Sequence, residues 1–420
     1  MSRVFYGWFV LAGLCLTYAA SNGILLNTLP LFYPSLIMEF SWDAAEVTGP
    51  ASLSFFATAI LSLFVGYLVD RFAPRPMMII GSIIFVGVLL AYRYITTLDQ
   101  MKAIYVGFSV ALALNGILPS MVVTSRWFSK YRGLAVGILL MASSFGGAVL
   151  PLIIGPILDE QGWRIALLTV AGIGFVMMVL PCVFILRNDP SEKNTVPDGS
   201  LSATSEVTEI PVAKGVVSGI TLVDAMKTPM FYLLAFSTAV MWFCISGVVQ
   251  HQSIYLGSDL GLPGPQLAQV FSVFFFSSVI GKVLFGWLSD KFAKVNIMLL
   301  ATANLTVGLV VLRLIDGDSM MSIYAYAVIY GIGFSGAFTM IQLMIAELFA
   351  GPTYGRILGV YVFIDTLAGG VGIAVLGRMR VASESYLPAI NLMIALCVAA
   401  FVCVLLIKRS INAPEPVRVG

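Results

Sequence analysis

Long runs of apolar residues, separated by short polar stretches, recur along the whole chain. A helix needs roughly 20 apolar residues to cross a bilayer, and each run is long enough. The pattern predicts twelve spanning helices, at residues 6–34, 46–69, 76–96, 102–125, 133–157, 163–186, 230–256, 265–289, 295–315, 320–349, 356–377 and 387–408. The first run exceeds the core of a signal peptide and shows no cleavage pattern, so we expect it to stay as a span.

One polar segment divides these spans into two sets of six. Residues 188–228 are rich in Ser, Thr, Pro, Glu and Lys, which is typical of a solvated linker. We therefore expect a first bundle at 1–187, the linker at 188–228 and a second bundle at 229–420. Near the end of the linker, residues 222–228 fit a short amphipathic helix on the membrane surface. The fold class predicted is an all-α integral membrane protein with two six-helix bundles.

The basic residues predict how the chain is oriented in the membrane. Lys and Arg are concentrated on the side that holds both termini and the linker, and the opposite loops contain far fewer. Loops with an excess of Lys and Arg face the cytoplasm. We therefore expect a multi-pass, monomeric protein of the cytoplasmic (inner) membrane with both termini in the cytoplasm.

A polar motif occurs twice. Residues 66–76 read GYLVDRFAPRP, and residues 286–294 read GWLSDKFAK. Each copy follows the second span of its half, which indicates a duplicated six-span unit with the substrate site between the halves. Either these residues break and re-form contacts as the halves rock, or they anchor the loops. The residues expected to form gate contacts are Asp70, Arg71, Arg75, Arg132, Asp290 and Lys291.

Composition supports a membrane protein and excludes several functions. The chain of 420 residues is 59% hydrophobic and 10% charged, whereas soluble domains carry about 25% charged residues. A net charge of +2, without a basic tract, gives no basis for binding nucleic acid. The five cysteines lie within apolar runs, and the single histidine has no catalytic or metal-binding partners nearby. We therefore predict no enzyme activity, no metal and no cofactor.

The motifs resemble those of the major facilitator superfamily. The two loop copies match its signature. Three stretches are similar to one branch of the superfamily, the monocarboxylate transporters and oxalate–formate antiporters. They are YGWFVLAGLCLTYAASNGILLNTLPLFYPSLIMEFSW, NGILPSMVVTSRWFSKYRGLAVGILLMASSFGG, and VVQHQSIYLGSDLG followed by IGKVLFGWLSDK. The resemblance covers nearly all of the chain outside the linker, and it implies alternating access to a small organic anion.

Two positions depart from that branch. Its usual arginine in the eighth span is replaced here by Lys282, which keeps the charge but loses the two-pronged fork that suits a carboxylate. The acid that some members place one turn earlier is Ser278 in this chain. The coupling mechanism of those members therefore cannot be transferred directly.

Charged side chains in the middle of a span are costly, so each is a functional candidate. Lys282 and Asp365 lie deep in the eighth and eleventh spans, and we expect each to contact the other, or a ligand, or both. Lys282 is predicted to bind the substrate carboxylate and Asp365 to carry a proton. A fixed ion pair, or a lysine that snorkels to the surface, is the structural alternative. His251, near the outer end of the seventh span, is a candidate for both substrate binding and proton coupling.

Uncharged polar residues in several spans complete the predicted site. Each could also form an ordinary hydrogen bond between helices. The predicted substrate-binding residues beside Lys282 and His251 are Asn115, Tyr330, Tyr361, Ser278, Trp242, Asn22 and Asn27.

These features favour a secondary transporter of a small organic anion, most of all a monocarboxylate, with proton coupling. The partners expected are a small carboxylate, a proton and the lipid bilayer. Two alternatives remain open at this point: an anion exchanger of the oxalate–formate type, and an efflux transporter for larger amphipathic compounds, which the 12% aromatic content would suit.

Overall fold

The computed structural model describes residues 5–71, 73–198, 221–315, 317, 319–349 and 354–412. Its first bundle consists of α1 (Gly7–Asn22), η1 (Gly23–Thr28), η2 (Leu29–Phe32), α2 (Tyr33–Phe40), α3 (Ala44–Arg71), α4 (Pro74–Tyr92), α5 (Leu98–Asn115), α6 (Ile117–Trp127), α7 (Arg132–Gln161), α8 (Trp163–Gly174), η3 (Phe175–Val179) and η4 (Pro181–Ile185). The short turn η5 (Pro190–Lys193) follows this bundle.

The second bundle begins after the short helix α9 (Leu222–Met226). It consists of α10 (Pro229–Ser253), η6 (Ile254–Asp259), α11 (Gly264–Lys291), α12 (Lys294–Leu314), α13 (Met320–Phe349), α14 (Tyr354–Ser383) and α15 (Leu387–Asn412). Among the described residues, 12 helical segments are long and apolar enough to cross a membrane. The predicted fold class is confirmed.

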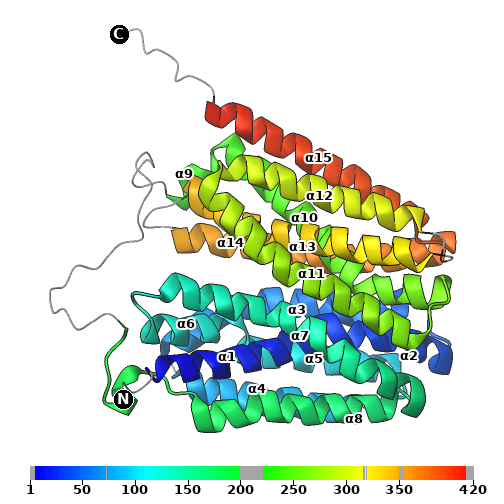
Figure 1. Cartoon of the computed structure of the whole chain (residues 1–420), viewed down its shortest axis with the longest axis horizontal. Coiled ribbons are helices and arrows are strands. Elements are labelled where there is room, and N and C mark those ends of the chain that lie inside the picture. Colours follow the sequence, from blue (N-terminus) through cyan, green and yellow to red (C-terminus); the bar gives the residue numbers. More distant parts are fainter. Residues whose placement is uncertain are drawn as a thin grey trace.

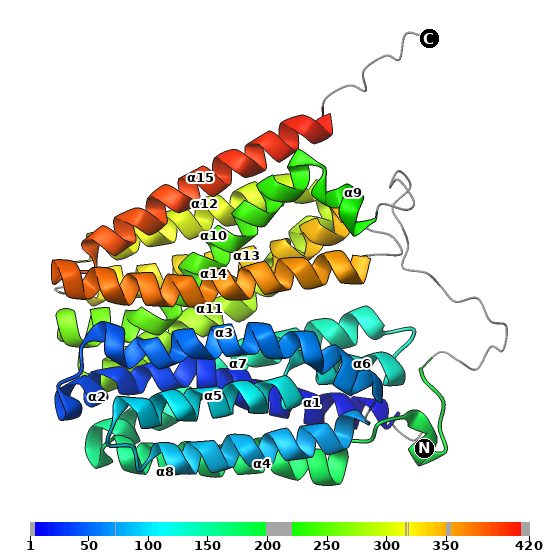
Figure 2. The ribbon, with the colours of Figure 1, turned by 180° about the vertical axis from the view of Figure 1, so that it is seen from behind.

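The two bundles lie side by side with their long helices running in roughly the same direction (Figures 1 and 2). The start of α1, the end of α15 and helix α9 all lie at one end of the molecule. We call this the linker end and the opposite one the distal end. Much of the predicted linker, residues 199–220, lies outside the described residues.

Several spans are not continuous α-helices. The fourth span breaks at Gly116, whose backbone is extended, so α5 ends at Asn115 and α6 begins at Ile117. The first and seventh spans, which open the two halves, contain the wide π-helical turns η1 and η6. Such turns are rare and occur often at functional sites. Each of the duplicated halves therefore has a π-helical turn in its first span.

Glycines bring the first and fifth helix of each half into close contact. In the first half, a Cβ added at Gly146 of α7 would overlap the Ala19 carbonyl of α1. In the second half, a Cβ at Gly372 of α14 would overlap the Phe243 carbonyl of α10. Small residues allow helix backbones in a membrane to approach in this way. Gly146 and Gly372 therefore serve the same packing role in the two copies.

Replacement of Gly146 by valine is expected to destabilise the protein. The added side chain meets backbone rather than a movable side chain, and overpacking of this kind costs about 1–3 kcal/mol. Thermal unfolding of the purified protein measures the loss. The same substitution at Gly137, also in α7 but with open space around it, is the matched control. An equal fall in melting temperature for both variants would contradict the packing role.

Candidate functional site

Two pairs of helices join the bundles, α7 with α11 and α3 with α14. The Ser144 and Ser278 hydroxyl oxygens lie 3.0 Å apart across the first pair. In the second pair, the Ser52 hydroxyl donates to the Gly370 carbonyl over 2.8 Å. Ser278, predicted to bind substrate, thus contacts the other half directly. These polar contacts are buried in the interior, where the two bundles meet.

Lys282 also reaches across the interface between the bundles. Its ammonium group donates to the Leu140 carbonyl over 2.9 Å and lies 3.5 Å from the Ser143 hydroxyl oxygen, both on α7. The side chain is only partly exposed. Both acceptors are neutral, and no carboxylate pairs with Lys282 among the described residues. A cation deep in a membrane protein therefore has hydrogen bonds but no counter-charge.

Polar side chains of the first span lie on the α7 side of this site. The Tyr18 hydroxyl lies next to the Ser143 side chain, and the Asn27 amide donates to the Ser143 carbonyl over 3.2 Å. Asn22 is partly exposed, and within the described part of the chain it donates only to its neighbour Ser21. Asn27 lies within η1, so the wide turn presents an amide to α7. The first span thus contributes hydroxyl and amide groups close to Lys282.

Aromatic rings lie on the other side of Lys282. Its Nζ lies 5.0 Å from the centroid of the Phe338 ring on α13. That ring packs edge-on against Trp242 of α10, with the two centroids 5.9 Å apart. Trp242 was expected in the site, whereas sequence reasoning missed Phe338. Phenylalanine is abundant in these spans, so nothing in the sequence distinguishes this one.

Asp365 is buried at the contact between α14 and α10. It is 3% exposed, its carboxyl lies next to the Thr238 side chain, and its Oδ1 has no hydrogen-bond partner. No ion pair joins Asp365 to Lys282, although both residues are described. The mutual pairing considered from the sequence is therefore not formed in this structure.

Three predicted binding residues form hydrogen bonds within their own bundle. Asn115 donates to the Ser82 hydroxyl over 2.6 Å. Tyr330 donates to the Cys244 carbonyl over 3.0 Å, and Tyr361 donates to the Phe231 carbonyl over 2.9 Å. All three side chains are fully buried. These contacts hold neighbouring helices together and give no support to substrate binding, which for these residues stays a prediction.

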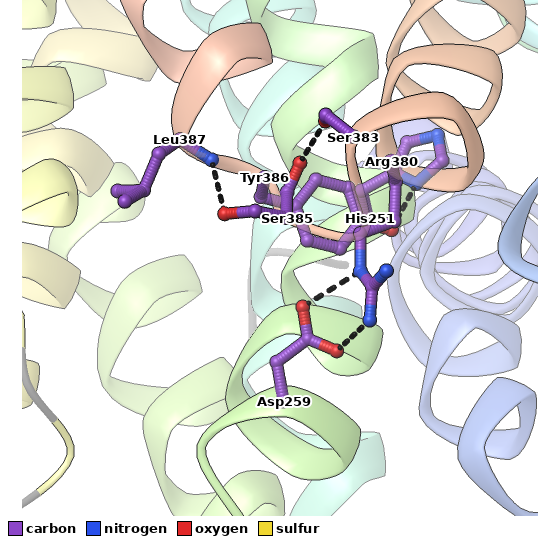
Figure 3. A network of polar contacts seen from close by, with 7 residues as sticks. All are labelled: His251, Asp259, Arg380, Ser383, Ser385, Tyr386 and Leu387. Atoms are coloured by element: carbon purple, nitrogen blue, oxygen red, sulfur yellow. Dashed lines mark hydrogen bonds and ion pairs between the residues drawn. The ribbon is translucent and has the colours of Figure 1, made fainter.

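His251 belongs to a polar network at the distal end of the second bundle (Figure 3). Its Nε2 lies 2.9 Å from the Ile373 carbonyl, which can only accept, so Nε2 carries a proton. Its Nδ1 lies 2.7 Å from the Tyr386 hydroxyl. Close by, Arg380 forms a two-pronged ion pair with Asp259, with contacts of 2.8 and 2.9 Å. His251 therefore ties α10 to α14 and to the loop before α15, and its predicted roles in binding and coupling remain untested.

The residues predicted to form the gate lie near the linker end. The Arg75 guanidinium donates to the Cys182 and Val183 carbonyls of its own bundle. Lys291 lies over the Trp287 ring of its own helix, and Asp290 and Arg132 are exposed. The side chains of Asp70 and Arg71 lie outside the described residues. None of the contacts named here crosses between the halves, so the gate role stays a prediction.

The bundles do meet at the distal end, through residues that sequence reasoning missed. Tyr33 of α2 donates to the Gln250 side chain of α10 over 2.7 Å, and both are buried. A Cβ at Gly155 of α7 would overlap Ala268 of α11. Gly377 of α14 likewise packs against α3. The distal end is therefore closed by a direct hydrogen bond and by tight helix contacts.

The comparison with known families decides the identity of the chain. The family model described as "Major Facilitator Superfamily" matches residues 10–373. The chain belongs to the major facilitator superfamily. It is therefore a membrane transporter, in agreement with the resemblance noted from the motifs. No group of three or more His, Cys, Asp or Glu side chains suited to a metal ion occurs in the described part of the chain.

Relatives within the superfamily are named for different functions. An uncharacterised transporter, YcxA of Bacillus subtilis, is 23% identical over 93% of this chain and 91% of its own length. Monocarboxylate transporter 13 of Bos taurus is 24% identical over 91% of this chain and 84% of its own. The agnestins efflux protein of Paecilomyces divaricatus is 24% identical over 81% of this chain and 72% of its own.

Solved structures of other transporters share the fold. A bacterial homologue of the human lysosomal transporter Spinster superposes with a TM-score of 0.71 at 18% identity, covering 97% of this chain and 98% of the other. The nucleoside transporter NupG superposes with a TM-score of 0.73 at 12% identity, covering 96% and 99%. At these identities the likeness concerns the fold alone.

Proposed function

We propose that this transporter carries a small organic monoanion, most of all a monocarboxylate, across the cytoplasmic membrane by alternating access. One observation carries the proposal: the Lys282 ammonium lies between the bundles, and its hydrogen-bond partners among the described residues are neutral oxygens. A charge at this depth costs roughly 2.5–3.5 kcal/mol on insertion scales. An anionic substrate would supply the missing counter-charge. The relatives named as monocarboxylate transporters support the same class.

The orientation follows from the basic residues described above. The linker end, where Lys and Arg are concentrated, faces the cytoplasm. The distal end, closed by Tyr33 and Gln250, then faces outward. In this conformation the substrate site is shut from the outside, and transport requires that the distal contacts open while the linker ends come together.

Counterflow in proteoliposomes tests the substrate class. Vesicles loaded with unlabelled lactate are expected to accumulate labelled lactate or a related small acid transiently, because both sides compete for one site. Efflux of an amphipathic dye from the same vesicles tests the second candidate, which is favoured by the relatives named as efflux proteins. Dye efflux without counterflow of any carboxylate would contradict the monoanion proposal.

Asp365 is proposed to carry the coupling proton. Protonation removes its charge, so the site would hold a carboxylate beside Lys282 without a second anion nearby. Uptake should therefore rise as the outside pH falls below the inside pH. In Asp365→Asn the group is permanently neutral, so counterflow should persist while pH-driven accumulation is lost. Labelled-acid uptake at several pH gradients measures both.

The matched control for Asp365→Asn is Glu384→Gln, which alters an exposed acid of the same bundle that has no predicted role in transport. It should accumulate substrate like the wild type. Full pH-driven accumulation by Asp365→Asn would place the coupling group elsewhere. A wild type that exchanges anions but ignores the pH gradient would instead favour an exchanger of the oxalate–formate type.

A further inference from the structure

The surroundings of Lys282 also bear on the body of the substrate. We infer that the preferred substrate is a monocarboxylate with an aromatic ring, its carboxylate at Lys282 and its ring against Phe338 and Trp242. The inference rests on the proposed function, because it assumes that Lys282 receives the carboxylate. It narrows the substrate class within that function.

The site is divided into a polar side and an aromatic side. Towards α7, the ammonium group meets the Leu140 carbonyl and the Ser143 hydroxyl. Towards α10 and α13, the same ammonium group faces the Phe338 ring, behind which Trp242 lies. A bound molecule that contacts both sides needs a charged end and an apolar end. A hydroxy acid of lactate size would satisfy only the polar side.

The two rings differ in exposure from three other aromatic side chains in the interior of this bundle. Tyr330, Tyr361 and Phe274 are fully buried in contacts between helices. Trp242 and Phe338 remain partly exposed, although they lie far from the ends of α10 and α13. Aromatic pairs favour edge-to-face or offset packing with centroids 4.5–7 Å apart. A third ring can join such a pair on its exposed side.

The Trp242 indole adds a polar group to the aromatic side. The indole N–H of Trp127 donates to the Arg187 carbonyl, and the indole N–H of Trp163 donates to the Glu39 carboxylate. Trp242 has a ring contact with Phe338 but no hydrogen bond to another described residue. Its N–H is thus available to a ligand. A hydroxyl or carbonyl substituent on the substrate ring would suit this donor.

The charge in the site limits the substrate to one carboxylate. In the described spans, Lys282 is the only basic residue far from a helix end. A dicarboxylate would bring a second negative charge to a site that offers one cation, and burying an unpaired charge is costly. A monoanion with an aromatic ring would instead place its single carboxylate at Lys282 and its ring against Phe338 and Trp242.

Binding of three probes to the purified protein tests the inference. Phenylacetate has the ring, cyclohexylacetate has similar size without the π-system, and lactate has neither. We expect the wild type to bind phenylacetate most tightly. The deciding quantity is the ratio of the lactate Kd to the phenylacetate Kd, measured by calorimetry. Both Phe338→Leu and Trp242→Leu should lower this ratio by about tenfold, as loss of an aromatic contact near 1.4 kcal/mol implies.

Two further variants make each outcome decisive. Trp287→Leu removes an exposed tryptophan at the linker end of α11 and should leave the ratio at its wild-type value. Trp242→Phe keeps an aromatic ring at this position, so the ratio of the lactate Kd to the phenylacetate Kd should stay close to the wild-type value. It keeps the inference testable if the leucine variants fail to fold. A wild type that binds lactate or cyclohexylacetate as tightly as phenylacetate would overturn the aromatic inference. The proposed function would survive that result if Lys282→Gln abolishes lactate binding, and it would fail if Lys282→Gln binds every acid normally.

Discussion

Substitution of Lys282 by glutamine is expected to lower carboxylate transport by about a hundredfold. Glutamine can still donate to the Leu140 carbonyl, so the contact between the bundles has a substitute. The positive charge is lost, and hydrogen bonds to charged groups contribute about 1.5–3 kcal/mol. A factor of a hundred corresponds to roughly 2.7 kcal/mol. Initial rates of labelled-acid counterflow in proteoliposomes give the measurement.

Two companion variants separate charge from structure. Lys227→Gln removes an exposed cation, which pairs with Asp224 at the linker end, and it should transport at the normal rate. Lys282→Arg restores the charge with a planar fork that binds carboxylates in two-pronged fashion, so it should recover much of the activity. Equal rates for Lys282→Gln and the wild type would show that the cation does not receive the substrate.

Replacement of Gly155 by tryptophan is expected to abolish transport altogether. Even a single carbon atom at this position would overlap Ala268 of the opposite bundle. An indole therefore cannot fit while the distal ends are closed, and the protein should be held open there. A transporter that cannot close one side cannot complete its cycle. Counterflow should fall to the level of empty vesicles, while carboxylate binding in detergent should persist.

The control for Gly155→Trp is the same substitution at Gly172. That residue lies in α8 with open space around its Cβ, and the variant should transport normally. If Gly155→Trp retained counterflow, closure of the distal ends between α7 and α11 would not be needed for transport. If it lost binding as well as transport, the substitution would have damaged the site or the fold instead.

The sequence is a good guide to the fold because the bilayer imposes a simple rule. A span needs a long apolar run, and the twelve predicted runs are matched by twelve spans. The break at Gly116 also follows from the chain, since Gly and Pro in NGILP permit a bend. The glycine runs at 145–147 and 368–372 are also visible in matching spans, where Gly146 and Gly372 pack closely against helix backbones.

The candidate site is less predictable, because polar residues inside a membrane have two uses. Asn115, Tyr330 and Tyr361 form hydrogen bonds that tie helices of one bundle together, as polar groups in lipid commonly do. Their depth is evident from the sequence, but the direction in which each points depends on how its helix is rotated. Phe338 and the Tyr33–Gln250 bond were missed because ring contacts and distant partners leave no local pattern.

The acceptor that holds Lys282 to the opposite bundle is the main-chain carbonyl of Leu140, and this has a genetic consequence. Any side chain at position 140 leaves that oxygen in place as long as α7 remains helical. Mutational scanning should therefore find position 140 tolerant and position 282 intolerant, although the two residues are direct partners. Covariation between the two codons should be absent, and revertants of a Lys282 mutant should map to neither Leu140 nor its immediate neighbours.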